Sequence, residues 1–169
     1  MQVEPNGVAV LPDGSKAYVA NTVSGTVSVI PLRIANGLIS KPSKHIPVGT
    51  EPYGLALTPN GTRLYVSNSR SDSVSVIDTA TDVVTNTIQN VGPEPRGLAI
   101  TNDGDADDSD ETLYVTQFLS LPVAGKVDGQ DDAKAGHVTI VSTATNLVTG
   151  QVTINPIADR FLCSRRRHC

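Results

Sequence analysis

Residues 51–68 are the most informative stretch of the chain, and they read Glu-Pro-Tyr-Gly-Leu-Ala-Leu-Thr-Pro-Asn-Gly-Thr-Arg-Leu-Tyr-Val-Ser-Asn. The same order of glutamate, proline, glycine and small apolar residues, followed by a Tyr-Val pair, occurs at residues 4–21 and again at residues 94–117. Self-similarity at a period of about 40 to 50 residues is typical of stacked repeat architectures. The chain is therefore expected to build its core by stacking copies of one small unit.

The middle copy divides into four short strands separated by turn signals. Residues 54–58 are short and apolar, and the following Asn60-Gly61 pair is typical of a tight hairpin. Residues 63–68 form the second expected strand, and residues 73–78 and 83–88 alternate apolar and polar side chains. Such a meander is marginal alone and becomes stable between identical neighbours. The sequence thus predicts an all-β fold, a β-propeller of four-stranded antiparallel blades.

Side-chain roles within a blade differ. The small residues of the Gly-x-Ala segment suit the crowded innermost strand beside the central channel. The tyrosines of the Tyr-Val pairs, Tyr18, Tyr65 and Tyr114, are expected to pack between blades. The recurring glutamates leave two interpretations open, an acidic ring at the channel mouth or carboxylates that bond backbone amides of the loop. They are Glu4, Glu51 and Glu94.

The Leu-Tyr-Val-Ser-Asn segment at residues 64–68 resembles the YVTN family of β-propeller repeats, as do its flanks Pro-x-Gly-Leu-Ala-Leu-Thr-Pro-Asn-Gly and Ser-Val-Ser-Val-Ile-Asp-Thr-Ala-Thr. The resemblance covers about residues 3–154. It implies a propeller, usually of seven blades, in bacterial or archaeal proteins that are mostly exported or surface-attached. Many members have no known activity. Related propellers include lactonases and haem- or copper-bearing reductase domains, so the fold alone does not determine the function.

The repeats are expected to fill residues 1–159 as about three blades, an incomplete propeller. Their approximate limits are residues 3–47, 50–91 and 93–155. A closed propeller needs about four to eight blades, so three would leave two bare apolar faces. The favoured explanation is that further blades of a longer parent chain complete the ring. The alternative is a self-complementing oligomer of this chain.

The last ten residues have a different composition from the repeats. Residues 160–169 hold both cysteines and four of the 13 basic residues, which a shifted reading frame or a wrong gene end would produce. Cys163, His168 and Cys169 in this tail are three zinc-type ligands without a fourth, a weak motif.

Charge and hydropathy limit the partners. Residues 1–159 carry 9 basic against 17 acidic residues, a formal charge of −8, which argues against nucleic acid as a partner. No apolar run approaches the roughly 18 residues of a membrane helix, so membrane insertion is not expected. The N-terminus shows no signal-peptide pattern.

An acidic insertion lies between the first two expected strands of the third repeat, six residues longer than its counterpart in the second. Asp103, Asp105 and Asp107 have the alternate spacing of a calcium loop, because hard cations take several oxygens from one turn. The match to an EF-hand ends there, since Asp108 replaces the required glycine and Tyr114 the bidentate glutamate. Two interpretations remain, a calcium site or a solvated acidic loop. The sequence suggests no other cofactor.

The connection at residues 118–135 is far longer than its counterparts in the other repeats. Loops of this length in a compact scaffold are usually functional or disordered. Its candidate binding residues are Phe118, Leu119, Leu121, Asp128, Asp131 and Asp132. Because successive connections of a meander alternate ends, this loop and the acidic insertion are expected at opposite ends of the blade.

No catalytic constellation stands out. His45 and His137 fall in or beside outer strands, and the haem-attachment motif Cys-x-x-Cys-His is absent. The favoured function is a non-catalytic scaffold that binds an unidentified protein or small molecule. The YVTN resemblance implies a periplasmic, cell-surface or extracellular place in bacteria. The alternatives are part of a lactonase-like or redox propeller enzyme with its active site in further blades, and a purely structural repeat of a surface-layer protein.

Overall fold

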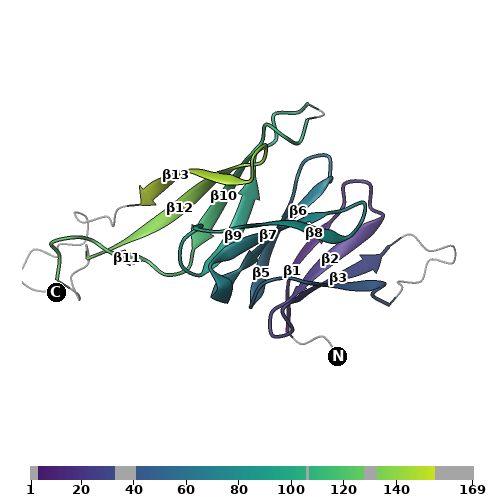
Figure 1. The fold of residues 1–169 in the computed structure, drawn as a ribbon, viewed down its shortest axis with the longest axis horizontal. Helices are drawn as coiled ribbons and strands as arrows, with labels where there is room; N and C mark the ends of the chain where they lie inside the picture. Colours follow the sequence, from purple (N-terminus) through teal and green to yellow (C-terminus); the bar gives the residue numbers. More distant parts are fainter. Residues whose placement is uncertain (1–3, 33–40, 106, 128–132, 155–169) are drawn as a thin grey trace, which may run out of the picture.

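Three antiparallel sheets stand side by side in the computed structural model, which describes residues 4–32, 41–105, 107–127 and 133–154 (Figure 1). The first sheet contains β1 (Pro5–Val10), β2 (Lys16–Asn21), β3 (Thr26–Pro31) and β4 (Lys44–Pro47). The second contains β5 (Pro52–Leu57), β6 (Arg63–Asn68), β7 (Ser73–Asp78) and β8 (Val83–Ile88). The third contains β9 (Pro95–Ile100), β10 (Thr112–Gln117), β11 (Leu121–Pro122), β12 (Lys134–Ser142) and β13 (Leu147–Ile154).

Each sheet is a meander in which consecutive strands pair. The order is β1-β2-β3-β4 in the first sheet and β5-β6-β7-β8 in the second, and β9, β10, β12 and β13 repeat it in the third. The two-residue β11 pairs with the start of β12, where it extends the sheet beyond the end of β10. The predicted all-β fold of four-stranded antiparallel blades is confirmed, and we call the three sheets the first, second and third blades.

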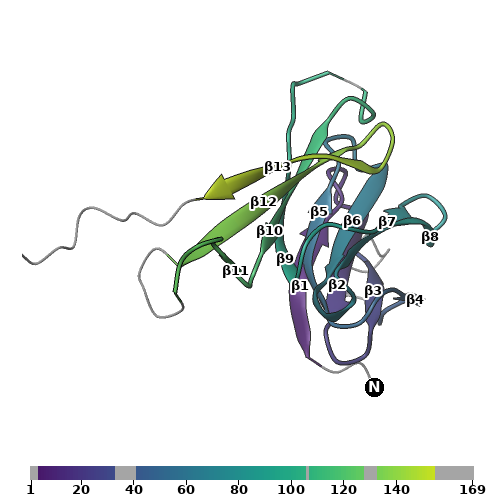
Figure 2. The same ribbon diagram turned by 60° about the vertical axis from the view of Figure 1, so that its left-hand side comes forward.

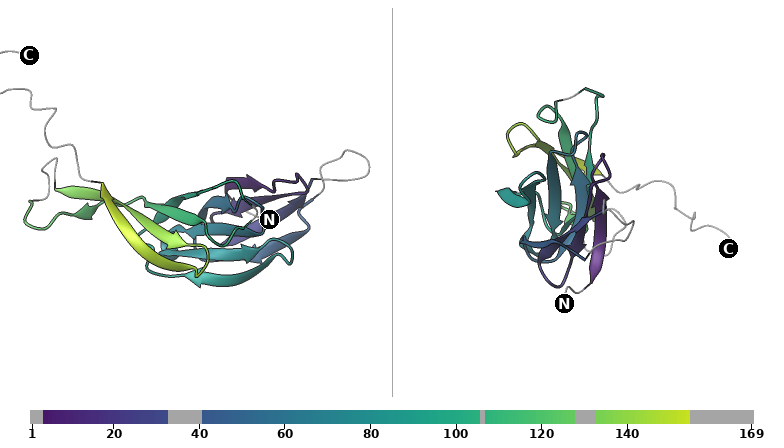
Figure 3. Two further views of the ribbon diagram at one scale, coloured as in Figure 1. Left: turned by 90° about the horizontal axis from the view of Figure 1, so that it is seen from above. Right: turned by 90° about the vertical axis from the view of Figure 1, so that its right-hand side faces the viewer.

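The blades form a row. The second blade lies between the other two in Figure 1, and from above the β12–β13 pair lies at the opposite end of the row from β1–β3 (Figure 3). The β11–β12 end of the third blade projects away from the first two (Figure 2). Among the residues that the structure describes, none forms a helix with the length and apolar character needed to span a lipid bilayer.

The inner strands β1, β5 and β9 approach one another so closely that only glycine fits at one position of each contact. A Cβ atom on Gly7 would lie 2.3 Å from the carbonyl oxygen of Tyr53, and one on Gly54 would lie 2.0 Å from that of Arg96. A real Cβ atom cannot approach a backbone oxygen this closely. The predicted crowding of the inner strand is confirmed, and the glycines of the first two Pro-x-Gly segments, Gly7 and Gly54, are the residues that permit it.

Two hydrophobic cores hold the blades together, and each lies between neighbouring blades. The core between the first and second blades contains Tyr18, Val27, Val29, Ile46, Leu64, Val66 and Ile77. The core between the second and third blades contains Tyr65, Val74, Val76, Ile88, Val91, Leu113, Val115 and Val141. Burial of these side chains requires both neighbours, so each blade depends on the next for its stability.

A tyrosine hydrogen bond reinforces each interface between blades. The hydroxyl of Tyr18 donates to the Asp82 carboxylate of the second blade at 2.7 Å, and that of Tyr65 donates to the Asn146 amide oxygen of the third at 2.9 Å. Both tyrosines are fully buried. Burial and the Asp82 carboxylate raise the pKa of the Tyr18 phenol above its ordinary value, so the phenol keeps its proton. We call the hydrogen bond from Tyr18 to Asp82, and the equivalent one from Tyr65 to Asn146, the tyrosine latch.

The acceptors of the tyrosine latch occupy equivalent turns. Asp82 and Asn146 both have left-handed backbone conformations, with φ values of 55° and 54°. Each closes the turn after a third strand, since its N–H donates to the carbonyl oxygen four residues earlier. Aspartate and asparagine tolerate this conformation better than most residues. The prediction of tyrosines between blades is thus confirmed for Tyr18 and Tyr65, whereas Tyr114 is 37% exposed.

Candidate functional site

Three loops at one end of the blades share a backbone arrangement set by the glutamates of the Glu-Pro pairs. Glu4, Glu51 and Glu94 have positive φ values of 57°, 52° and 45°. Their carbonyl oxygens accept hydrogen bonds of 2.9 Å from the N–H groups of Thr22, Ser69 and Phe118, respectively. The backbone of each glutamate thus ties the start of the inner strand to the loop after the second strand. We call this end of the blades the Glu-Pro face.

Two of the three carboxylates on the Glu-Pro face, those of Glu51 and Glu94, pair with arginines, which neither interpretation of the sequence anticipated. Glu51 lies 3.7 Å from Arg70 of the short 3-10 helix η1 (Ser69–Ser71), and Glu94 lies 3.4 Å from Arg96. The Glu51–Arg70 pair is exposed, so solvent screens most of its attraction. The Glu94–Arg96 pair is more buried, with side-chain exposures of 22% and 31%.

Arg96 is the centre of an aromatic cluster that spans two blades. Its guanidinium carbon lies 3.6 Å from the ring centre of Phe118 and 5.0 Å from that of Tyr53. The Nε atom also approaches the Ser69 hydroxyl at 3.4 Å. Contacts of a guanidinium with ring faces are favourable and hold the arginine in one place. We call Tyr53, Glu94, Arg96 and Phe118 the Arg96 cluster.

The long connection after β10 starts at this cluster. Phe118 is 59% exposed although one ring face covers Arg96, and Leu119 beside it is 46% exposed. Leu121 lies in β11, opposite Ala135 of β12, and the N–H of Val123 donates to the Ala133 carbonyl at 2.8 Å. The start of the loop is thus fixed to the Glu-Pro face at Phe118 and to β12 from Leu121 onward. Of the six predicted binding residues, Asp128, Asp131 and Asp132 lie outside the described residues.

The acidic insertion between β9 and β10 lies at the opposite end of the third blade from this loop, as predicted (Figure 1). Its carboxylates close a series of short turns. The N–H of Asp105 donates to Asp103 at 3.1 Å, that of Asp107 to Asp105 at 2.7 Å and that of Ser109 to Asp107 at 2.8 Å. Local bonds of this kind are the preferred role of aspartate in turns.

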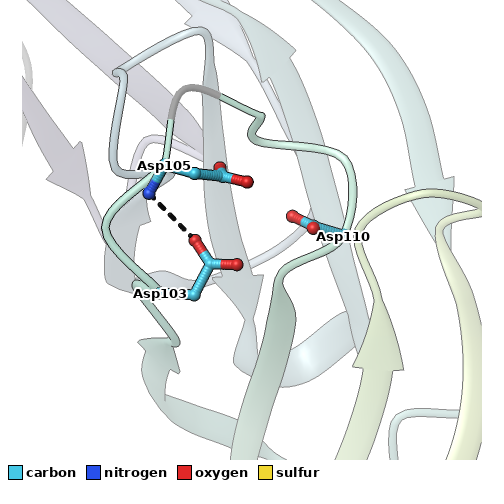
Figure 4. A group of neighbouring side chains, drawn as sticks. All are labelled: Asp103, Asp105 and Asp110. Atoms are coloured by element: carbon cyan, nitrogen blue, oxygen red, sulfur yellow. Dashed lines mark hydrogen bonds between the residues drawn. The ribbon is translucent and has the colours of Figure 1, made fainter.

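Three carboxylates of the insertion converge. Oxygen atoms of Asp103, Asp105 and Asp110 all lie within 4.8 Å of one another, and the side chains turn toward one another across the loop (Figure 4). The sequence pattern predicted Asp107 as the third member of this group, but the structure has Asp110 there. The Asp107 carboxylate instead accepts hydrogen bonds from Ser109, and these hydrogen bonds lower the pKa of Asp107. Partial desolvation and the charges of Asp103 and Asp105 raise the pKa of Asp110.

Two other acids of the insertion are buried and hold it in place. The Asp108 carboxylate accepts hydrogen bonds from the N–H of Asn60 at 2.8 Å and from the N–H and hydroxyl of Thr62 at 3.3 and 2.5 Å. It thereby fastens the third blade to the β5–β6 hairpin of the second. Glu111 accepts hydrogen bonds from the Thr101 hydroxyl and the Asp103 N–H. No pattern in the sequence separates these two acids from the exposed ones.

A serine and a histidine meet in the first blade. The Ser28 hydroxyl lies 2.9 Å from Nδ1 of His45 on the neighbouring strand and accepts a bond from the Asn21 amide at 2.9 Å. Ser28 is only 4% exposed. In the second blade Asn68 donates to Ser75 at the same distance, with no histidine opposite. The pair therefore belongs to a repeated structural network and not to a nucleophile with its base.

The family model for "Lactonase, 7-bladed beta-propeller" matches residues 2–106, more than half of the chain. The chain belongs to this family of β-propellers. Its match does not single out the YVTN repeats within the propellers. No curated protein sequence matches the chain.

Solved structures with similar folds are also propeller-like. A hydrazine synthase of Kuenenia stuttgartiensis has 28% sequence identity and a TM-score of 0.68, over 90% of this chain and 38% of that one. A functionally unknown protein of Desulfotomaculum acetoxidans has 17% identity and a TM-score of 0.65, over 89% and 43%. A Bacteroides uniformis protein provisionally named 6-phosphogluconolactonase has 15% identity and a TM-score of 0.59, over 88% and 40%. The chain thus spans about two fifths of these structures.

Proposed function

We propose that this chain is a YVTN-type segment of a lactonase-family propeller that binds a polypeptide partner through its Glu-Pro face. The Arg96 cluster is the observation that carries the proposal. Phe118 is 59% exposed and yet fixed by its contact with the Arg96 guanidinium. A fixed, exposed aromatic ring loses little entropy when a partner covers it, which is the property of a binding hot spot.

The residues around Phe118 support a polypeptide as the partner. Leu119, which follows Phe118 in the chain, is 46% exposed, so the apolar surface extends beyond one ring. Glu94 and Arg96 supply a charged border of both signs next to it. An apolar centre with a polar rim is the usual composition of a protein–protein contact. The resemblance to YVTN repeats supports a position at the bacterial cell surface or in the envelope as part of this proposal.

A peptide selected on the immobilised chain tests the Glu-Pro face directly. We expect peptides enriched from a random phage library to bind the Phe118→Ala/Leu119→Ala double variant at least about tenfold more weakly, because one hot-spot side chain contributes that much. Val83→Ala is the matched control, since Val83 is an apolar residue of β8 with 50% exposure, between the values of Phe118 and Leu119. Equal affinities for all three proteins, measured by fluorescence anisotropy, would contradict the proposal.

A lactone hydrolase is the second candidate, and the family match at residues 2–106 favours it. Its test is the hydrolysis of 6-phosphogluconolactone, the compound that the name of the Bacteroides uniformis protein implies. Under the binding proposal the purified chain gives the rate of buffer alone. Turnover that Arg96→Ala abolishes and Val83→Ala leaves intact would replace the binding proposal by a catalytic one.

The acidic insertion is proposed as a calcium site formed by Asp103, Asp105 and Asp110. Three exposed carboxylates give few ligands, so we expect a dissociation constant in the range of about 0.1–1 mM, as in extracellular calcium modules. Calorimetry should show that Asp110→Asn abolishes binding, whereas Asp107→Asn, which leaves the converging group intact, retains most of it. Equal loss in both variants would show that the calcium ligands differ from this group.

A further inference from the structure

A groove of about 440 Å³ opens between the outer strands of the second and third blades. Asn86 and Ile88 of β8 line one side, and Asn146 and Leu147 line the other. Ile88 forms its buried floor, and Leu147 is 64% exposed at its rim. None of the residues that line it is a lysine or an arginine. The groove lies along the last strands of the two meanders, whereas Tyr53 and Arg96 of the Arg96 cluster lie in the inner strands β5 and β9.

The equivalent place between the first and second blades is bridged by a lysine. Nζ of Lys44 in β4 donates to the carbonyl oxygens of Asp82 at 2.6 Å and of Thr81 at 3.3 Å. These carbonyls belong to the turn that also accepts the tyrosine latch. Carbonyl oxygens at the end of such a turn can accept hydrogen bonds from an ammonium group, which has three N–H donors. We call the carbonyl oxygens of the last two residues of the turn the ammonium seat.

The strand register shows that Asn86 in the second blade occupies the position equivalent to Lys44 in the first blade. Lys44 pairs with Val29, which pairs with Tyr18, and Asn86 pairs with Val76, which pairs with Tyr65. The two tyrosines donate to Asp82 and Asn146, which end equivalent turns. The second interface therefore repeats the ammonium seat at the turn that ends at Asn146. The side chain of Asn86, which aligns with Lys44, is too short to reach across the groove to it.

We infer that this groove binds a lysine side chain of a partner polypeptide. The lysine ammonium donates to the carbonyl oxygens of Thr145 and Asn146, and its methylene groups lie along Ile88 and Leu147. The amide of Asn86 supplies one further acceptor beside them. The formal charge of −8 on residues 1–159 favours a cationic partner.

The strands beside the groove favour a polypeptide over a free amine. Within the described residues β8 pairs only with β7, and β13 with β12, so each presents a strand edge next to the groove. An extended segment can pair with such an edge while one of its side chains enters the neighbouring groove. The lysine supplies the specificity of this contact, and the main-chain hydrogen bonds supply much of the affinity.

The first experiment supplies the lysine within the chain. Asn86→Lys should raise the melting temperature by about 1–3 °C, because a solvent-exposed charged contact adds only a small stabilisation. Lys44→Met should lower it by a similar amount at the first interface. Asn86→Met, which has a long side chain without the ammonium, should not raise it. An equal rise for Asn86→Met and Asn86→Lys would overturn the ammonium seat.

The second experiment supplies the lysine from outside. Acetyl-Val-Lys-Val-amide should shift the backbone amide resonances of Asn86, Asn146 and Leu147 with a dissociation constant of millimolar order. Its norleucine counterpart should not, and Asn86→Lys, which fills the seat, should weaken the peptide at least about fivefold. Equal shifts from the norleucine peptide, or undiminished binding by Asn86→Lys, would overturn the site. If cadaverine, a free amine without a peptide backbone, binds as tightly as the peptide, the proposal that the partner is a polypeptide is contradicted.

Discussion

Gly54→Ala is expected to separate the second and third blades. Its added Cβ atom would lie 2.0 Å from the Arg96 carbonyl oxygen and 3.1 Å from the Ser67 hydroxyl. Because the first of these atoms belongs to the backbone of a neighbouring strand, β9 must move as a whole. We expect a loss of about 3 kcal/mol or more in the free energy of unfolding, and a fall of about 6–12 °C in the melting temperature.

Gly150→Ala is the matched control for this substitution. Gly150 also lies in a strand with φ outside the left-handed region, and its added Cβ atom would meet nothing closer than the Ile140 Cδ1 atom at 3.8 Å. Its melting temperature should stay within about 2 °C of the unmodified chain, since surface substitutions rarely exceed 0.5 kcal/mol. Similar losses for both variants in a calorimetric melt would show that the close contact of β5 with β9 is not what Gly54 permits.

Asp108→Ala is expected to be the most damaging substitution in the acidic insertion. Its carboxylate is 7% exposed and accepts three hydrogen bonds from Asn60 and Thr62 of the second blade. Removing it leaves two backbone N–H groups without this acceptor. We expect a loss of about 2–3 kcal/mol, measured by urea denaturation. Asp107→Ala, a change of an exposed acid one position earlier, should lose less than about 1 kcal/mol.

The contribution of Asp108 should depend on pH in a defined direction. Burial alone would raise the pKa of its carboxyl, but the hydrogen bonds from Thr62 and Asn60 outweigh burial and lower that pKa below the ordinary value. Stability from Asp108 is therefore fully present above the unfolded-state pKa of about 4 and is lost as the pH falls through the lower folded-state pKa. The stability difference between the chain and Asp108→Asn should shrink over this range. A difference that is constant from pH 7 to pH 2.5 would contradict the assignment.

The repeat explains why so much of the fold could be predicted from the sequence. Strand positions, hairpins and the burial of Tyr18 and Tyr65 recur with the same local pattern, so each copy supports the interpretation of the others. The acceptors Asp82 and Asn146 could have been found in the same way, because both follow a Thr-Ala-Thr segment. The repeated segment marks both turns in the sequence. The pattern alone does not identify the tyrosine of the neighbouring blade that donates to each of them.

The candidate sites were harder to predict because they lie where the repeat is interrupted. Spacing placed Asp103 and Asp105 together, but the path of the loop between them and β10 brings in Asp110 and buries Asp108. The contact of Phe118 with Arg96 joins two segments with no shared pattern. Contacts of this kind depend on the three-dimensional course of an insertion, which one sequence does not specify.

The tyrosine latch also bears on how such a chain can grow. The second blade carries both halves of it, since Asp82 accepts the bond from the blade before and Tyr65 donates the bond to the blade after. A gene segment that encodes one blade therefore carries a donor for one neighbour and an acceptor for the other. An in-frame duplication of that segment would yield an extra blade already matched on both sides, without any compensating mutation.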